Sequence, residues 1–425
     1  MAQFLSEYMW TWLAYTLAAL VHIFLLLNLV AVGALLFIWL ERKISGRIQD
    51  RLGPTRVGGR FGWLQTLADG LKLLTKEDLM PGGADAFLFK LAPYVSFCAS
   101  LAAFMAIPFA GGAYPFVAIH LNIAVFFIIA VLGLEVFGVI LAGYSSASKW
   151  SLFGAMREAA QVVSYEVPLG LCAVIPVLLA GSMDLVYIGD RQAGGFWNWY
   201  IFHDPFTFIT FWIYFTCATA SVNRAPFDLA EAESELVAGF HTEYSGLRWS
   251  FFFMAEYGSM LAVSLLASIL FLGGWHGPLP IATWLGLTFE QGFWYGIAGN
   301  VLGTLNVLFK GCVGVSVMMW VRWTLPRLRI DQVITTCLKY CVPIAAAMFL
   351  GATFWQYMWP GGLLLAEPAQ SYALAELRPD EVPAASEAPA EEPIETAAET
   401  LSPAALSRER GDGERVVADR PLRAR

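Results

Sequence analysis

Eight long runs of apolar residues divide the first 360 residues of this 425-residue chain. A helix that crosses a bilayer needs roughly 20 predominantly apolar residues, and each run approaches or exceeds that length. Only 14% of the residues are charged, against about 25% in typical soluble domains. The sequence therefore predicts an all-α polytopic membrane protein with eight transmembrane helices. The runs cover about 14–40, 87–110, 117–142, 162–182, 206–222, 250–273, 296–321 and 335–358.

Basic residues alternate between the two sides of these runs. Fifteen Lys and Arg residues fall in four alternate segments, which are 41–86, 143–161, 223–249 and 322–334. The opposite segments, 1–13, 111–116, 183–205 and 274–295, hold only Arg191. Cytoplasmic loops carry the excess of Lys and Arg in membrane proteins. We therefore expect the four basic segments to be cytoplasmic loops of a transmembrane domain covering 1–360, with both termini periplasmic.

Residues 361–425 differ in composition from the rest of the chain. They are rich in Ala, Glu and Pro, and they carry 13 acidic and 7 basic side chains. Such a segment buries too little apolar surface to offset the entropy of ordering it. We expect a disordered acidic tail.

Cysteine and histidine usage argues against a metal or haem site. All six cysteines lie in apolar runs, and none forms a Cys-x-x-Cys pair. Among the five histidines only His22 and His120 lie near the predicted spans, too few to expect a haem held by paired helices. We expect the cysteines to be packing residues, and the chain to bind no metal, haem or flavin.

The first basic segment contains more than a topology anchor. Gly53-Pro54 and Gly58-Gly59 predict turns that a simple helix end would not need. Beyond them, four leucines fall on one helical face and Gln65, Asp69, Lys72 and Lys76 fall on the other; the leucines are Leu64, Leu67, Leu71 and Leu74. This pattern predicts a short amphipathic helix lying in the membrane interface.

Three of the ionisable residues inside the predicted spans stand out by their position. Glu135 and Glu166 lie in the third and fourth runs, and Lys310 lies about midway along the seventh. A charge at such a depth needs a partner, a hydrated cavity or a shifted pKa. These residues are candidates for a proton path, although static ion pairs would give the same sequence pattern.

The segment after the fifth run is unusually acidic. Six carboxylates follow Arg224 within it or close behind, namely Asp228, Glu231, Glu233, Glu235, Glu243 and Glu256. A helix capped by Asn223, with Pro226 in its first turn, would account for two of them. Like charges at Glu231 and Glu235, four residues apart, would raise a pKa or recruit a cation such as Arg224. The pattern favours a site that responds to a nearby change in charge.

Taken in order, these motifs resemble the H subunit of bacterial NADH–quinone oxidoreductase (respiratory complex I), whose mitochondrial counterpart is NADH dehydrogenase subunit 1. The similarity covers about 14–358. Its motifs are Glu41-Arg42-Lys43, Arg51-Leu52-Gly53-Pro54, Ala68-Asp69 with Lys72, Ser164-Tyr165-Glu166-Val167, Asn223-Arg224-Ala225-Pro226-Phe227-Asp228, Ala255-Glu256-Tyr257, Trp320-Val321-Arg322 and Pro326-Arg327-Leu328-Arg329.

The resemblance implies a place in a proton-translocating complex of the bacterial inner membrane. Quinone, either ubiquinone or menaquinone, would be the substrate. Partners would be the hydrophilic arm with the terminal iron–sulfur cluster, small membrane subunits and antiporter-like subunits, together with membrane lipid and no nucleic acid. The residues implied for the quinone chamber are Glu41, Arg42, Arg51, Asp69, Lys72, Arg224, Asp228, Glu231, Glu233 and Glu235. Those assigned to proton coupling are Glu166, Glu243 and Glu256 by resemblance, with Lys310 and Glu135 added from their depth in the runs.

The chain also departs from the family pattern. Many relatives carry an acid two positions before the Asn-Arg pair, where this chain has Ser221. Glu135 and Glu158 are not family positions, and they are either local substitutes or simple variation. Two alternatives stay open at this point: the related membrane subunit of a hydrogenase or formate hydrogenlyase complex, and a free-standing ion transporter. We expect no catalysis from the isolated chain.

Overall fold

The computed structural model describes residues 10–112, 114–230, 233–287, 289 and 291–359. All regular secondary structure in these ranges is helical, which confirms the predicted all-α membrane fold. Two predictions fall outside the described residues: the tail at 361–425 and Glu231.

The long helices follow the predicted apolar runs. They are α2 (Thr11–Ile48), α4 (Ala86–Ala103), α5 (Ala124–Ser145), α6 (Lys149–Ala180), α8 (Pro205–Ser221), α10 (Gly246–Phe271), α12 (Phe293–Thr324) and α14 (Val342–Met358). The last of these continues from α13 (Ile330–Thr335) through a π-helical segment, Thr336–Cys341.

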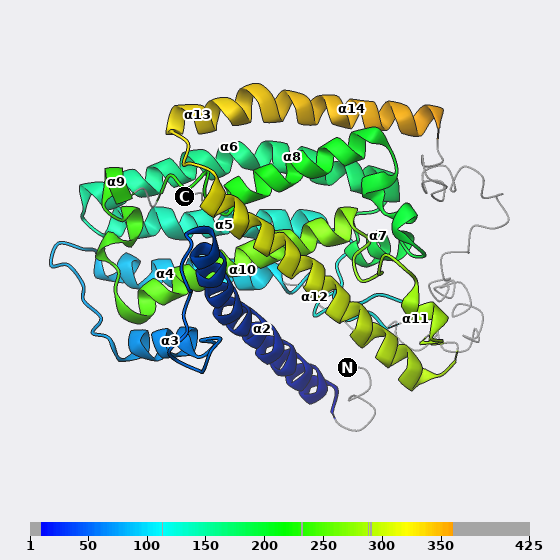
Figure 1. The fold of residues 1–425 in the computed structure, drawn as a ribbon, viewed down its shortest axis with the longest axis horizontal. Coiled ribbons are helices and arrows are strands. Elements are labelled where there is room, and N and C mark those ends of the chain that lie inside the picture. The colour runs from blue at the N-terminus through cyan, green and yellow to red at the C-terminus, as the bar shows by residue number, and fades with distance from the viewer. Residues whose placement is uncertain (1–9, 113, 231–232, 288, 290, 360–425) are drawn as a thin grey trace, which may run out of the picture. The chain divides into compact units, whose positions relative to one another are not determined.

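Seven helical segments of the described chain are long and apolar enough to cross a membrane, one fewer than predicted. The difference is α8, which has 17 residues and is therefore about 25 Å long, shorter than the roughly 30 Å hydrocarbon core. This helix nevertheless runs from the end of the bundle that holds α7 (Leu185–Arg191) to the end that holds α9 (Glu233–Leu236) (Figure 1). The loops of the bundle therefore still alternate between its two ends, as the basic residues predicted.

Short helices mark the two ends of the bundle. The segments predicted to be basic loops carry α3 (Gln65–Thr75), α9 and α13, which gather at one end, whereas α7 and α11 (Ile281–Trp284) lie at the other (Figure 1). Helix α3 is the predicted amphipathic helix. Its Leu67, Leu71 and Leu74 are exposed, as expected of a face that meets lipid.

Most of the segment predicted as the loop 143–161 is helical. Helix α6 begins at Lys149 rather than near residue 162. Hydropathy misplaced this boundary because the first three turns carry Arg157, Glu158 and Gln161. Glu158 and Gln161 are nevertheless buried, and Asn223 of the α8–α9 loop forms a hydrogen bond with each of them.

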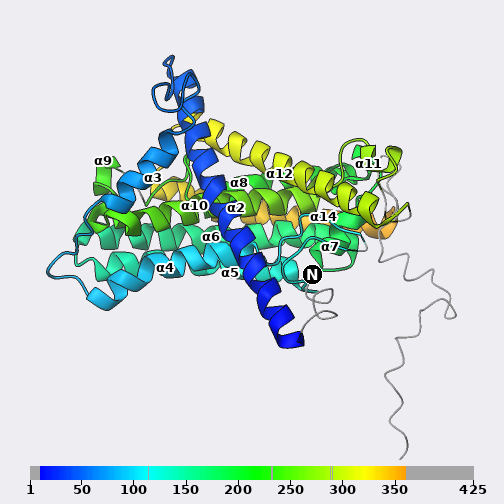
Figure 2. The same cartoon turned by 90° about the horizontal axis from the view of Figure 1, so that it is seen from below.

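Helix α10 is the centre of the bundle. It contacts α2, α4, α6, α8 and α12, and 83% of its spanning window is buried, against 17% for α2. Figure 2 shows α2 crossing the other long helices obliquely on one side of the bundle. Polar side chains on α10 are therefore enclosed by protein, while α2 presents most of its surface outward.

Helix α6 approaches the turn Gly239–Glu243 very closely. A Cβ atom built on Gly154 would lie 2.8 Å from the Cα atom of Gly239. Gly239 itself has φ +54°, a conformation that favours glycine. Two glycines thus allow the backbone after α9 to lie directly on α6.

Gly154→Ala should therefore destabilise the protein by about 1–3 kcal/mol, since the new methyl group meets immobile backbone. Gly170→Ala, in the same helix, has nothing within 4 Å of its Cβ position and should be neutral or better. Thermal inactivation of the detergent-solubilised complex compares the two variants. Equal inactivation temperatures would contradict this account of the α6 contact.

Candidate functional site

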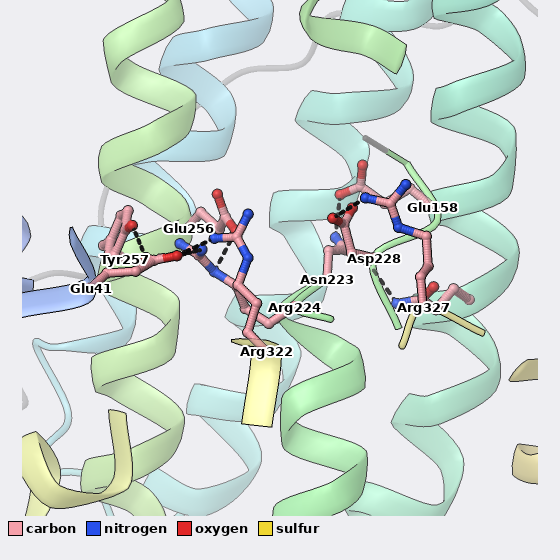
Figure 3. Close-up of polar contacts among 10 residues, drawn as sticks. Glu41, Glu158, Asn223, Arg224, Asp228, Glu256, Tyr257, Arg322 and Arg327 are labelled. Carbon is pink, nitrogen blue, oxygen red and sulfur yellow. Dashed lines mark hydrogen bonds and ion pairs between the residues drawn. The ribbon is translucent and has the colours of Figure 1, made fainter. Parts of the chain in front are cut away.

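A compact ion-pair cluster lies where α2, α10, α12 and the α8–α9 loop meet (Figure 3). Arg224 Nε lies 2.7 Å from Glu256 Oε1, and Arg224 Nη1 lies 3.4 Å from Glu41 Oε2. Glu41 also accepts hydrogen bonds from Arg322 and from the Tyr257 hydroxyl. The Arg224 guanidinium stacks over the Tyr257 ring, 4.4 Å from its centroid. Four distant segments are thereby joined through five side chains.

Because this cluster is largely buried, its positive and negative charges must balance. The side chains of Arg224 and Glu41 are only 3% and 8% exposed. Two carboxylates, Glu41 and Glu256, face two guanidiniums, Arg224 and Arg322, so the group is neutral as a whole. Burial opposes the charge of Arg224, but Glu256, Tyr257 and Glu41 outweigh it and hold the Arg224 pKa above its usual value. Removing one member would leave an uncompensated buried charge.

The backbone segment that carries Arg224 is irregular. Helix α8 ends at Ser221, Asn223 adopts φ +53°, and the Ala225–Pro226 peptide is cis. The alternative interpretation of this segment, in which Asn223 caps a helix starting here, does not hold. Its amide instead donates to Glu158 Oε1 at 2.6 Å and accepts from Gln161 Nε2 at 3.0 Å. These bonds to α6 replace the cap and turn the loop towards the bundle.

Asp228 and Glu235 of this acidic segment form ion pairs with arginines other than Arg224. Asp228 Oδ2 lies 2.8 Å from Arg327 Nη2, and the amide of Leu328 donates to the carbonyl of Pro226 at 2.9 Å. Glu235 pairs with Arg157 at 2.5 Å. Glu235 thus recruits a cation, one of the two predicted outcomes, but the cation is Arg157 and not Arg224, because Glu41 and Glu256 already hold Arg224.

Glu235 also differs from the prediction that a like charge on the same helical face would raise its pKa. Its hydrogen bond to Arg157, and then the charge of that residue, lower its pKa. Asp228 precedes α9 and shares no helical face with Glu235. Glu233 begins α9, and Glu231 is outside the described residues. Asp228 and Glu235 are thus each paired with an arginine rather than poised by mutual repulsion.

A cavity of about 30 Å³ with both polar and apolar walls lies beside the cluster, large enough for one or a few water molecules. Three carboxylates line it, Glu135 from α5, Glu158 from α6 and Glu256 from α10. Ser221 and His241 also contribute to the wall. Glu135 accepts a hydrogen bond from Ser259, which follows Glu256 by about one helical turn. Glu256 therefore belongs both to the ion-pair cluster and to the cavity.

A second, exposed group joins α2 to α3. Asp69 pairs with Arg42 at 2.5 Å and with Lys72 at 3.3 Å. Partial burial opposes its ionisation, but the hydrogen bond and charge of Arg42, followed by Lys72, lower the Asp69 pKa. Arg51 donates to Gln49 at 2.7 Å and is exposed. These predicted chamber residues lie on the interfacial side of α2, apart from the buried cluster.

The remaining candidates for proton coupling are dispersed. Glu166 is half-buried on α6 against Gly133, where an added Cβ would lie 2.5 Å from its Oε1. Glu243 is half-buried at the end of its turn. Lys310 donates to the carbonyls of Leu272, Gly274 and His276 at 2.6–2.8 Å, beyond the C-terminal end of α10. Leu272 follows Glu256 by 16 residues, about 24 Å along the helix.

Several members of the site were not among the predicted site residues. Tyr257, Arg322, Arg327 and Asn223 lay within recognised motifs, yet no spacing rule connects them to Glu41 or Asp228. Glu158 was weighed only as a local substitute, and burial at a polar helix start is the signal that identifies it. Among the described residues, no group of three His, Cys, Asp or Glu side chains is arranged to hold a metal ion.

These features define a class: a polytopic helical membrane protein with a neutralised charge cluster and an acidic cavity at one end of its bundle. Residues 21–353 match the family model described as NADH dehydrogenase. The chain is 44% identical to the H subunit of NADH-quinone oxidoreductase from Chlorobium luteolum over 346 residues, which are 81% of this chain and 89% of that one.

Other relatives give the same result. Identity to the corresponding subunit of Chlorobaculum tepidum is 45%, over 74% of this chain and 86% of the relative. Identity to that of Anaeromyxobacter dehalogenans is 42%, over 79% and 81%. The chain belongs to the family of NADH–quinone oxidoreductase H subunits, the counterparts of mitochondrial NADH dehydrogenase subunit 1, and is a membrane subunit of that complex.

Arg224→Met should destabilise the protein by about 3–5 kcal/mol, because Glu41 and Glu256 would remain buried with one guanidinium between them. Adding Glu256→Gln should restore part of the loss. The amount of assembled complex on native gels measures both effects. Arg157→Met is the control, since its partner Glu235 is exposed and the pair contributes less than about 1 kcal/mol. Equal assembly of the two single variants would refute the importance of the buried charges.

Proposed function

We propose that this protein forms the quinone-access chamber of NADH–quinone oxidoreductase and couples quinone reduction to proton translocation. The relatives favour this function over a role in a hydrogenase-type complex or as a free-standing transporter, because each of those compared is named as the H subunit of NADH-quinone oxidoreductase. The proposal places quinone, either ubiquinone or menaquinone, beside the α8–α9 loop.

One observation carries the coupling proposal. Arg224 bridges Glu41, a residue assigned to the chamber, and Glu256, a residue assigned to proton coupling. A change in charge on the chamber side therefore acts directly on an acid that lines the cavity. A unit charge at about 4 Å is worth roughly 4 kcal/mol at an effective dielectric constant of about 20, or about three pKa units.

The cavity acids are the proposed proton acceptors. Glu135 and Glu158 share the cavity with Ser221, the position where many relatives carry an acid. In this chain the two glutamates supply carboxylates to the space next to Ser221. Water in the cavity would connect them to Glu256 without direct contact. Glu166, Glu243 and Lys310 are proposed to extend the path towards the antiporter-like subunits; Lys310 binds the carbonyls of Leu272 and Gly274, just beyond the end of α10.

Quinone is proposed to enter from the lipid beside α2, α3 and α10, which contact one another. The exposed leucines of α3 and the Arg42–Asp69–Lys72 group would frame that opening. Residues Arg51, Asp228, Glu231, Glu233 and Glu235 are assigned to the chamber lining on the same proposal. The four basic segments would face the cytoplasm and the hydrophilic arm, leaving both termini periplasmic.

Glu256→Gln should lower quinone-dependent NADH oxidation per assembled complex by about tenfold, because the side-chain shape is kept and the charge is lost. Loss of this charge from the cluster should also lower the amount of assembled complex, which native gels measure. Inner-membrane vesicles report both oxidation and proton uptake. Asp78→Asn is the matched control, since Asp78 pairs with Arg248 at the same end of the bundle but is 41% exposed. Activity equal to that of the control would exclude Glu256 from the coupling site.

Glu135→Gln with Glu158→Gln should separate pumping from electron transfer. The KM for quinone should stay unchanged, because neither residue belongs to the proposed chamber. The number of protons moved per NADH should fall, because two carboxylates of the cavity no longer accept protons. Proton uptake measured together with NADH oxidation in vesicles gives this ratio. A raised KM with an unchanged ratio would assign the cavity to quinone binding instead.

A further inference from the structure

His241 brings a different chemistry to the cavity beside the ion-pair cluster. It belongs to the turn Gly239–Glu243, lines the cavity and is only 8% exposed. The described lining contains three carboxylates, those of Glu135, Glu158 and Glu256, but no Lys or Arg. His241 is therefore the only side chain of the described lining that can carry a positive charge.

The backbone fixes His241 in the cavity wall. Its amide donates to the carbonyl of Ala238 at 3.1 Å, and its own carbonyl accepts from the amide of Tyr244 at 3.1 Å. The turn contacts α5 and α6, and a Cβ atom on Gly154 of α6 would lie 2.8 Å from the Cα atom of Gly239. The turn thus lies directly against α6, one of the helices that supply the cavity carboxylates.

Three aromatic rings pack around the imidazole. The ring centroids of Phe240, Phe252 and Trp249 lie 4.0, 5.7 and 6.1 Å from that of His241. Aromatic rings attract a cation within about 6 Å, and nearby carboxylates favour the charged form of a base. The surroundings of His241 therefore suit an imidazolium as well as a neutral imidazole. Histidine is the side chain that ordinarily changes charge between about pH 5 and 8.

The fixed cations of this region are engaged outside the cavity wall. Arg224 pairs with Glu256 but does not line the cavity, and Arg157 of α6 pairs with the exposed Glu235. A protonated His241 would thus share the cavity with carboxylates alone. The acidic groups supplied by the elements around His241 are Glu135 of α5, Glu158 of α6, Glu256 of α10 and Glu243 of its own turn.

We propose that His241 is a proton relay of the coupling site: it holds a proton in the cavity and passes it through cavity water to Glu256 when quinone reduction weakens the Arg224–Glu256 pair. The proton leaves an imidazole nitrogen and binds a carboxylate oxygen, so an imidazolium and a carboxylate become two neutral groups. Negative charge on the chamber side attracts Arg224 away from Glu256 and favours this transfer. The relay rests on the proposed function, because it needs Glu256 to respond to quinone.

The test compares His241→Gln with the wild type in inner-membrane vesicles containing the whole complex, with rates expressed per assembled complex from native gels. Glutamine keeps a hydrogen-bonding side chain but cannot carry the proton. At about pH 6 the variant should oxidise NADH with quinone about 10- to 100-fold more slowly. The deficit should shrink towards about pH 8, because His241 of the wild type then loses its proton as well. The KM for quinone should stay unchanged, since His241 is not assigned to the chamber.

His120→Gln is the matched control. His120 also faces a carboxylate, that of Asp184 at 2.8 Å, but Asp184 caps α7 at the other end of the bundle. Its pH profile should equal that of the wild type. A deficit of His241→Gln that is the same at every pH would assign His241 to packing and overturn the relay, as would wild-type rates in the assembled variant. His241→Asn is the second variant; if neither variant assembles, His241 is a structural residue and the relay is overturned.

Failure of the relay and failure of the proposed function give different results. Glu256→Gln, and Glu135→Gln with Glu158→Gln, test the proposed function in the same vesicles. If those variants lose activity or pumping and His241→Gln does not, only the relay fails. If none of these variants differs from the wild type, the proposed function fails together with the relay.

Discussion

A buried charge must be neutralised where it lies, and the Arg224 cluster shows what this requirement does to the fold. Arg224 comes from a loop, Glu41 from α2, Glu256 and Tyr257 from α10, and Arg322 from α12. Because Arg224 and Glu41 are buried once the bundle has closed, their contacts with the other members fix the packing of four segments. The irregular loop after α8 positions the guanidinium of Arg224 within this cluster.

The same constraint places the cavity next to the charges. Carboxylates from α5, α6 and α10 share a space of about 30 Å³ with Ser221, so a proton can be accommodated there. Arg157 and Arg327 pair with Glu235 and Asp228, which do not line the cavity. Glu256, in contrast, both pairs with Arg224 and lines the cavity.

Hydropathy alone predicted the class of fold, because the cost of exposing backbone in lipid leaves helices as the way to cross it. It predicted α3 and the placement of the long helices well. It misjudged α6, whose polar start is buried by bonds from Asn223, and it counted α8 as a full crossing although that helix has 17 residues. The error at α6 arises because neighbouring protein buries the polar side of the start of this helix.

The sequence by itself determined the membrane class, the alternation of basic loops and the family, since these depend on local composition and on motifs read along the chain. It also marked Glu41, Arg224 and Glu256 as candidates. Only the tertiary structure decided their partners: Arg224 pairs with Glu41, which precedes it by 183 residues, rather than with the acids beside it. The physical reason is that ion pairing inside a bundle follows distance in space, which helix packing sets and sequence spacing does not.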